Sequence, residues 1–457
     1  MSIFLSNVEN FPQLFNVSDD NKKTFGEVTT DYIIIEKMLN LIPIKYFQNP
    51  KLKWLDPCSG GGYFMICLYF KLFKHLKNTI PNKKKRFQHI INNMIYMIDI
   101  NPNHISNLKK IFGNNANIFC QDYLDYNIDN NIIFDFIIAN PPYNIGNISV
   151  PTSNNNNKNT TIWPNFIKKM INHLYDYGNL IVIIPSVWMK KSHYMNSYIT
   201  QFHIKYIHTM NNTLTNKMFH GHAQTPTSYF YLIKKPTNEY TYIYDYNVQA
   251  YISFNINNTL PVHSINVIKK LLHFVYKYGK LNIIKTNLDK NIRNKSITIS
   301  PQYTNSHQYP NVVTCKLKDN CPILNISYTN KPCLYYNKPK LILANKMYGL
   351  PYLDNNGSLG VYSKDNYIIS DLSMDDFEIV QKYLFCKLIY YIYESTRYRM
   401  KNLEKEAFDF IPNILNAPNI IDINDDVIYN LFKLNDKEIQ YINDFFPRNI
   451  SNSHLIQ

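Results

Sequence analysis

The chain has 457 residues, enough for two or more globular domains, and its 45% apolar content argues against a disordered protein. Lys and Arg outnumber Asp and Glu by 48 to 33, so the formal charge of +15 favours a polyanionic partner such as nucleic acid. Seven scattered cysteines fit no common zinc spacing, and we find no secretory signal or bilayer-length apolar run, so we expect an intracellular protein with free thiols, no metal and no membrane partner.

The first half of the chain has the pattern of an α/β protein. Residues 1–24 indicate a polar N-terminal arm, and residues 31–47 carry helical periodicity. From residue 52 to 140, short apolar runs alternate with helical stretches, which is typical of βαβ units around a parallel sheet. The expected strands are 53–56, 95–99, 118–119, 134–139, 180–184, 203–210 and 226–233, with a helix over 163–176.

The second half has a different pattern. Residues 240–375 are strand-like and rich in turns, whereas 374–402 and 425–445 have helical periodicity. We therefore predict three segments: an N-terminal arm over 1–24, a Rossmann-like α/β domain over 25–236 and an α+β domain over 237–457.

The most informative motif is the tetrapeptide Asn140, Pro141, Pro142 and Tyr143, which follows the apolar run 134–139. Two prolines end the strand in a stiff turn, at the carboxyl end where open α/β sheets place their ligand chemistry. An Asn amide oxygen and a proline carbonyl together accept both protons of a planar amino group. Because Tyr143 adds a flat face for stacking, the turn suits the exocyclic amine of a flat base.

Three further signals follow earlier strands. Residues 55–64 read Leu-Asp-Pro-Cys-Ser-Gly-Gly-Gly-Tyr-Phe, a glycine-rich turn that is neither a P-loop nor a dinucleotide fingerprint. Asp99 ends the second strand, where an acid can bind two ribose hydroxyls. Asp122 follows the third strand and can accept from a purine amine. For a lone Asp the alternative is a helix cap or a turn carboxylate. The order of all four motifs at successive strand ends favours a nucleoside-containing ligand.

These motifs resemble the N6-adenine DNA methyltransferases that use S-adenosylmethionine, in the group where a target-recognition domain follows the catalytic motif. That group includes the modification enzymes of restriction–modification systems. The resemblance implies the catalytic residues Asn140, Pro141, Pro142 and Tyr143. It implies the cofactor-binding residues Thr30, Asp56, Pro57, Cys58, Gly60, Gly62, Asp99, Ile100, Asp122, Tyr123 and Asn140. It also implies contacts of a flipped-out adenine with Tyr143 and Phe219, although Phe219 fits a packing role equally well.

The resemblance is less complete at two places. Residues 25–30 resemble the N-terminal motif in which a Thr binds the methionine carboxylate, but Asp31 stands where the family usually has Pro. Residues 335–342 and 357–367 resemble the specificity domain, so they imply DNA target recognition in the second half. Candidate phosphate contacts are the basic groups 83–86, 190–191 and 397–401, of which 83–86 fits a solvated face better.

Other functions share parts of this pattern. The same tetrapeptide serves enzymes that methylate a protein glutamine amide or a guanine amine in ribosomal RNA, whereas N4-cytosine enzymes usually have Ser in place of Asn140. A non-catalytic nucleic-acid-binding subunit is an alternative of another class. The expected partner is double-stranded DNA, and a separate cognate restriction endonuclease is a candidate second partner.

Overall fold

The computed structural model divides into two compact units, Met1–Tyr244 with Ser253–Asn258, and Asp245–Ile252 with Thr259–Gln457. It describes residues 30–125, 132–144, 161–219, 221, 225–318, 321–345, 351–399, 402–418 and 422–445. The predicted arm 1–24, the motif residues 25–29 and the polar stretch 145–160 lie outside the described residues.

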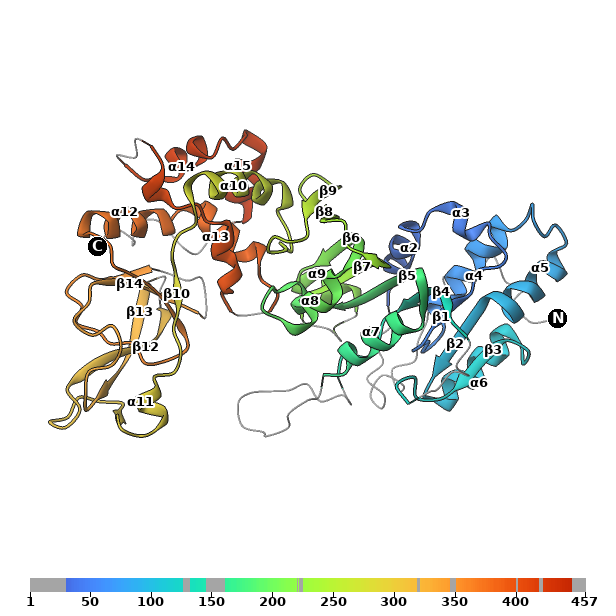
Figure 1. Ribbon diagram of the computed structural model, residues 1–457, viewed down its shortest axis with the longest axis horizontal. Coiled ribbons are helices and arrows are strands. Elements are labelled where there is room, and N and C mark those ends of the chain that lie inside the picture. The colour runs from blue at the N-terminus through green and yellow to red at the C-terminus, as the bar shows by residue number, and fades with distance from the viewer. Residues whose placement is uncertain are drawn as a thin grey trace. The chain divides into compact units, whose positions relative to one another are not determined.

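The first unit contains a nine-stranded sheet in the order β3-β2-β1-β4-β5-β7-β6-β8-β9 (Figure 1). The strands are β1 Trp54–Asp56, β2 Ile95–Asp99, β3 Asn117–Cys120, β4 Phe134–Ala139, β5 Leu174–Pro185, β6 Phe202–Met210, β7 Thr227–Pro236, β8 Tyr240–Asp245 and β9 Ala250–Asn255. Strands β3, β2, β1, β4 and β5 are mutually parallel, and β7 is antiparallel to both β5 and β6. This topology confirms the predicted Rossmann-like α/β fold.

Helices cover both faces of this sheet because its central strands are apolar on both sides (Figure 1). The helices of the unit are α2 Tyr32–Asn40, α3 Ile44–Phe47, α4 Tyr63–His75, α5 Lys83–His89, α6 Pro102–Phe112, α7 Trp163–Asn172, α8 Tyr194–Thr200 and α9 Asn212–Met218. Phe136 and Ile138 of β4 share one buried cluster with residues of α2, α4 and α6. Helix α7 takes no part in that cluster and packs against β5 from the other face.

The first unit extends further than the sequence indicated. The domain edge was expected after residue 236, yet β8 pairs in parallel with β6 through Tyr206 and Tyr242. The sheet therefore continues beyond β7, and the structural division falls after Tyr244. Apolar periodicity does not reveal such an edge, because strand pairing is not local in sequence.

Three expected helices are each divided into two. Residues 31–47 form α2 and α3, and Pro43 is the N-cap of α3. Residues 374–402 form α12 Met374–Leu384 and α13 Lys387–Ser395, divided at Cys386, which is extended (φ −66°, ψ 145°). Residues 425–445 form α14 Asp425–Leu431 and α15 Asp436–Phe445. Helical periodicity continues across each break because the helices on both sides of it bury apolar side chains.

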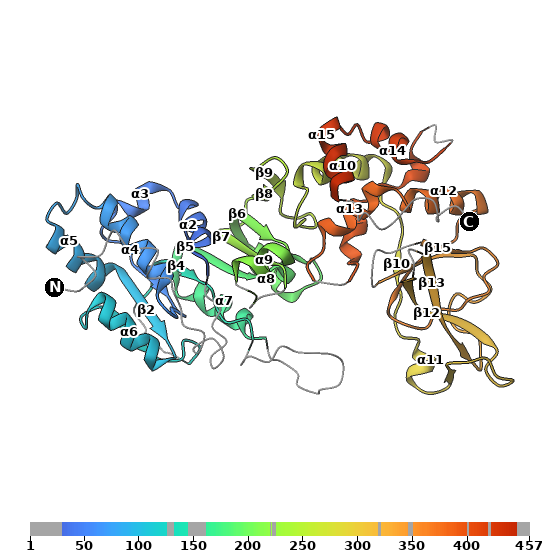
Figure 2. The same cartoon turned by 180° about the vertical axis from the view of Figure 1, so that it is seen from behind.

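The second unit is α+β, as predicted. It contains a four-stranded sheet in the order β10-β16-β14-β15 and a three-stranded sheet in the order β11-β13-β12, whose long strands β12 and β13 lie side by side (Figure 2). The strands are β10 Ile284–Lys285, β11 Ile299–Ser300, β12 Tyr309–Lys318, β13 Cys321–Thr329, β14 Lys340–Ala344, β15 Pro351–Asp354 and β16 Asn366–Ser370. Besides α12 to α15, its helices are α10 Ile265–Tyr278 and α11 Lys290–Arg293.

The two segments that resemble a specificity domain, 335–342 and 357–367, meet in this unit. The backbone N–H of Asn337 donates to the carbonyl of Gly357 at 2.8 Å. A Cβ on Gly357 would lie 2.4 Å from Lys338 N, and its φ is +66°, so this close approach requires glycine. Nearby, the buried Lys340 donates to Asp354 at 2.5 Å, which anchors β14 to the end of β15.

Within the described residues, the helices are all too short or too polar to cross a membrane. The same part of the chain brings together no group of three or more His, Cys, Asp or Glu side chains that could hold a metal ion.

Candidate functional site

The predicted motifs meet at the switch point of the sheet. Strand β1 pairs with β2 on one side and with β4 on the other, so the chain runs outward from β1 in opposite directions. Loops that diverge from the carboxyl ends of such strands leave a crevice where ligands bind. The glycine-rich turn leaves β1 after Asp56, and the turn that starts at Asn140 leaves β4.

The glycine-rich turn has a left-handed backbone conformation and packs closely against α6. Gly60 and Gly62 have φ of 49° and 81°, and Gly62 is the N-cap of α4. A Cβ on Gly62 would lie 2.3 Å from Leu108 Cδ2 of α6. The turn therefore requires glycine at residue 62, both for its left-handed conformation and for the packing of α6 against it.

Asp56 is a buried carboxylate with an unsatisfied oxygen. Its Oδ1 accepts from the backbone N–H of Cys58 at 3.2 Å, whereas its buried Oδ2 has no hydrogen-bond partner among the described residues. Burial, with repulsion from Asp99, raises the pKa of Asp56 to about 8. A buried carboxyl group that has one oxygen without a partner and a second acid nearby is an environment that a cationic ligand would stabilise.

Asp99 connects the ends of β1 and β2. Its Oδ2 accepts from the backbone N–H of Gly60 at 2.7 Å, and its Oδ1 accepts from the backbone N–H of Asn101 at 2.8 Å. Nδ1 of the buried His104 lies 3.1 Å from the same Oδ1. The carboxylate thus has the cap-like bonds that we considered as the alternative, but it also fixes the glycine-rich turn. The next residue, Ile100, is 62% exposed, an unusual position for a large apolar side chain beside a buried acid.

His104 was not identified from the sequence. The only local signal is its position five residues after Asp99, which places it in the first turn of α6.

The turn at the end of β4 contacts both the glycine-rich turn and the N-terminal motif. Asn140 Nδ2 donates to Oγ1 of the buried Thr30 at 3.0 Å, and the backbone N–H of Asn140 donates to the Cys58 thiol. Burial raises the pKa of that thiol well above its ordinary value, so it is protonated at neutral pH. Thr30, Cys58 and Asn140 therefore lie together, whereas the resemblance implied a cofactor role for Thr30 and no contact with Asn140.

Tyr143 is half-buried, and its hydroxyl is buried with no hydrogen-bond partner among the described residues. Burial raises the pKa of the hydroxyl above its ordinary value. Its carbonyl accepts from the backbone N–H of Ile162 at 3.1 Å, immediately before α7. The start of α7 is thereby fixed to the end of this turn.

Two predicted site side chains are packed inside the first unit. Phe219 is 0% exposed and belongs to the core cluster between the sheet and α2, so its position favours the packing role over a contact with a base. Tyr123 is 2% exposed, and its hydroxyl lies 2.9 Å from His173 Nδ1. Its side chain is directed at α7, while the preceding Asp122 stays half-exposed.

The basic groups have varied surroundings. Arg86 is buried over the ring of Phe73 and donates to the carbonyl of Ile80 at 2.8 Å, which is a structural role. Arg397 forms an ion pair with Glu394, and Arg399 lies 3.8 Å from Glu404. Lys401 lies outside the described residues.

Comparison with known proteins adds a family match. Residues 32–216 match the model of the Eco57I restriction-modification methylases. A segment of 77 residues is 35% identical to an uncharacterized adenine-specific methylase of Mycoplasma pneumoniae, and it covers 16% of this chain and 18% of that protein.

Solved structures are similar at low identity. The type IIL restriction-modification enzyme MmeI, solved in complex with DNA, is 10% identical with a TM-score of 0.49, covering 96% of this chain and 76% of that one. A modification subunit of a putative type I restriction enzyme from Vibrio vulnificus is 12% identical with a TM-score of 0.39, covering 52% of this chain and 50% of that one. The chain therefore spans about half the length of that subunit and less than a fifth of the curated methylase.

Proposed function

Since residues 32–216 match the restriction-modification methylases, as the sequence motifs predicted, we propose that this chain is a site-specific DNA methyltransferase. It transfers a methyl group from S-adenosylmethionine to the N6 amine of adenine in double-stranded DNA. The observation that carries this proposal is the direct contact between Asn140 and both Thr30 and Cys58. The residue that would accept the amine thus contacts the glycine-rich turn through its backbone N–H and Thr30 through its side chain, at the switch point of the sheet.

The residues present fit S-adenosylmethionine. This cofactor carries an ammonium and a sulfonium charge, and the unpaired Oδ2 of Asp56 is a buried acceptor for such a cation. Asp99 would bind the ribose hydroxyls, and Asp122 the adenine amine, beside the exposed side chain of Ile100. The glycines of the turn let the backbone approach the ligand.

The chemistry needs positioning more than acid–base catalysis. When bound, the cofactor supplies a methyl group already activated on sulfonium. Adenine N6 is a weak nucleophile because its lone pair is delocalised into the ring. Because Asn140 Nδ2 donates to Thr30, Asn140 Oδ1 is the acceptor atom of the side chain, and with the Pro141 carbonyl it would accept both N6 protons. These bonds stabilise the positive charge that develops on N6.

The target adenine must leave the duplex to reach this turn. Flipping a base out costs a few kcal/mol, and stacking on an aromatic ring returns about 1–3 kcal/mol. Tyr143, half-buried directly after Pro142, is the ring that we assign to this role.

The decisive experiment measures transfer from labelled S-adenosylmethionine to unmethylated duplex DNA, followed by nucleoside analysis. N6-methyladenine is the expected product. Label in RNA or in a protein glutamine instead would contradict the DNA substrate, and the absence of cofactor binding would favour a non-catalytic nucleic-acid-binding subunit.

We expect Thr30→Val to lower kcat about tenfold, because the variant leaves the Asn140 amide without its acceptor, and a lost hydrogen bond of this kind costs about 1–2 kcal/mol. Thr30→Ser keeps the hydroxyl and should keep most of the rate. Steady-state kinetics of the two variants, with KM for both substrates, check this. If Thr30→Val had the same kcat as the wild type, Thr30 would not orient Asn140.

DNA affinity should fall steeply with salt, because the proposed binding of DNA by a chain of net charge +15 would neutralise phosphates and release counterions. With about six such contacts, affinity would fall roughly 10³-fold between 50 and 200 mM salt. Fluorescence anisotropy of a labelled duplex over this range measures the slope. A flat response would contradict phosphate-dominated binding.

A further inference from the structure

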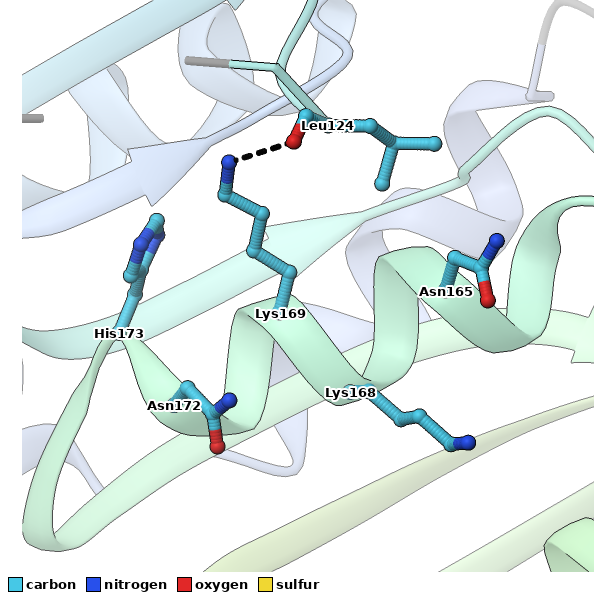
Figure 3. A pocket seen from close by; sticks show the side chains of 6 residues that line it. All are labelled: Leu124, Asn165, Lys168, Lys169, Asn172 and His173. Carbon is cyan, nitrogen blue, oxygen red and sulfur yellow. Dashed lines mark hydrogen bonds between the residues drawn. The ribbon is translucent and has the colours of Figure 1, made fainter. Parts of the chain in front are cut away.

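The loop that carries Asp122 is held by one face of α7. Lys169 Nζ donates to the carbonyl of Leu124 at 2.8 Å (Figure 3). The backbone N–H of Leu124 in turn donates to Asp122 Oδ1 at 2.8 Å. The backbone of Leu124 is therefore held at both its polar groups. Lys169 of α7 binds its carbonyl, and Asp122, the predicted adenine-binding acid, binds its N–H.

A second contact holds the same loop. The ring of Tyr123 stacks on Phe166 at 5.7 Å, and its hydroxyl lies 2.9 Å from His173 Nδ1. Burial, with the nearby Lys169 charge, lowers the pKa of His173 to about 4, while burial raises that of Tyr123 well above its ordinary value. At neutral pH both groups are uncharged, so the tyrosine donates and the histidine accepts.

We infer that Lys169 is a positioning residue for cofactor binding: through Leu124 it orients the Asp122 carboxylate toward the 6-amino group of the cofactor adenine. This inference rests on the proposed use of S-adenosylmethionine. Lys169 is half-buried and its Nζ lies 5.3 Å from the centroid of the Tyr123 ring, so one side chain contacts two successive residues of the loop. Burial lowers the pKa of Lys169 below its ordinary value, and the nearby carboxylates of Asp125 and Asp122 oppose that shift.

The same helix offers a matched control. Lys168 is exposed and points away from Leu124 in Figure 3, and its Nζ lies over the rings of Tyr194 and Tyr198 at 5.9 and 5.7 Å. Lys168→Met and Lys169→Met each remove one positive charge from α7 and keep a long side chain. A loss confined to Lys169→Met is therefore not a general charge effect.

The experiment titrates S-adenosylmethionine into the full-length protein by calorimetry. Lys169→Met should weaken binding about tenfold, because a misoriented Asp122 carboxylate would lose its hydrogen bond to the cofactor adenine, with kcat at saturating cofactor within about twofold of wild type. Lys169→Arg should recover part of the affinity, and Lys168→Met should match wild type. Thermal melting of every variant checks that α7 still packs.

A double-mutant cycle separates orientation of Asp122 from simple stability. In an Asp122→Ala background, Lys169→Met should cause little further loss, because the residue through which it acts is gone. A cofactor analogue with hydrogen in place of the 6-amino group should bind wild type and Lys169→Met equally. The inference would be overturned if the losses of cofactor affinity from Lys169→Met and Asp122→Ala were additive. It would also be overturned if Lys169→Met weakened binding of the analogue as much as binding of S-adenosylmethionine.

Failure of the inference is distinct from failure of the proposed function. If wild type binds no S-adenosylmethionine, the cofactor assignment itself is refuted. If wild type binds it while Lys169→Met and Lys168→Met behave alike, only the role of Lys169 is refuted.

Discussion

Asn140→Ala is expected to reduce methyl transfer about 10²–10³-fold, the loss that accompanies removal of one group aimed at developing charge. The variant removes the side-chain acceptor but keeps the carbonyl of Pro141. It also leaves the backbone N–H that donates to Cys58, so the glycine-rich turn retains that contact. The affinity for S-adenosylmethionine should therefore change little.

Single-turnover transfer and calorimetric cofactor binding measure the two effects separately. Asn140→Asp is the matched control, because it keeps an acceptor of the same shape and should retain more activity than Asn140→Ala. If Asn140→Ala transfers methyl groups at the wild-type rate, Asn140 does not accept a hydrogen bond from the target amine. If it loses cofactor binding in parallel, Asn140 serves cofactor binding or the structure of the site, and its assignment as the amine acceptor is not supported.

Asp56→Asn is expected to have opposite effects on binding and on stability. Asn keeps an Oδ1 acceptor for the Cys58 N–H but removes the negative charge that would meet the cationic cofactor. We expect cofactor affinity to fall by about 10- to 10²-fold, since hydrogen bonds to charged groups contribute roughly 1.5–3 kcal/mol. The unliganded variant should nevertheless melt at a higher temperature than wild type at pH 8.

The pH dependence follows from the raised pKa of Asp56. Its folded pKa of about 8 lies above the ordinary value of 3.8, so between these values the folded state binds a proton that the unfolded state does not. This carboxyl therefore lowers the stability of the wild type progressively as pH rises from about 4 to about 8. The difference in melting temperature between Asp56→Asn and wild type should grow over the same window.

Cofactor binding should be linked to the same proton. A bound cation favours the carboxylate, so binding below pH 8 releases a proton and affinity rises with pH by up to about tenfold per unit. Calorimetry in two buffers of different ionisation enthalpy counts that proton. A binding enthalpy independent of buffer at pH 7 would show that Asp56 is already ionised or takes no part.

The sequence predicted strands correctly where a buried apolar run is followed by a residue that ends a strand or forms a turn. The run 134–139, which is apolar except for Asp135, matches β4 because a buried parallel strand is nearly continuously apolar, and a turn with two prolines follows it. The run 95–99 matches β2 because this buried parallel strand is also mostly apolar, and Asp99 ends it as expected. Helical periodicity located α12 to α15 but did not reveal their breaks, because separate helices that bury residues keep one period.

What the sequence by itself determined is the α/β class and the position of each motif at a strand end, since both depend on neighbouring residues. Only the tertiary structure decided which distant residues meet: Thr30 with Asn140 across 110 residues, and Lys169 with Leu124 across 45. It also decided that Phe219 is packed in the core and that the sheet extends past β7 to β8. The physical reason is that local preference fixes where a strand ends, whereas the packing of whole helices and the pairing of strands fix what lies beside that end.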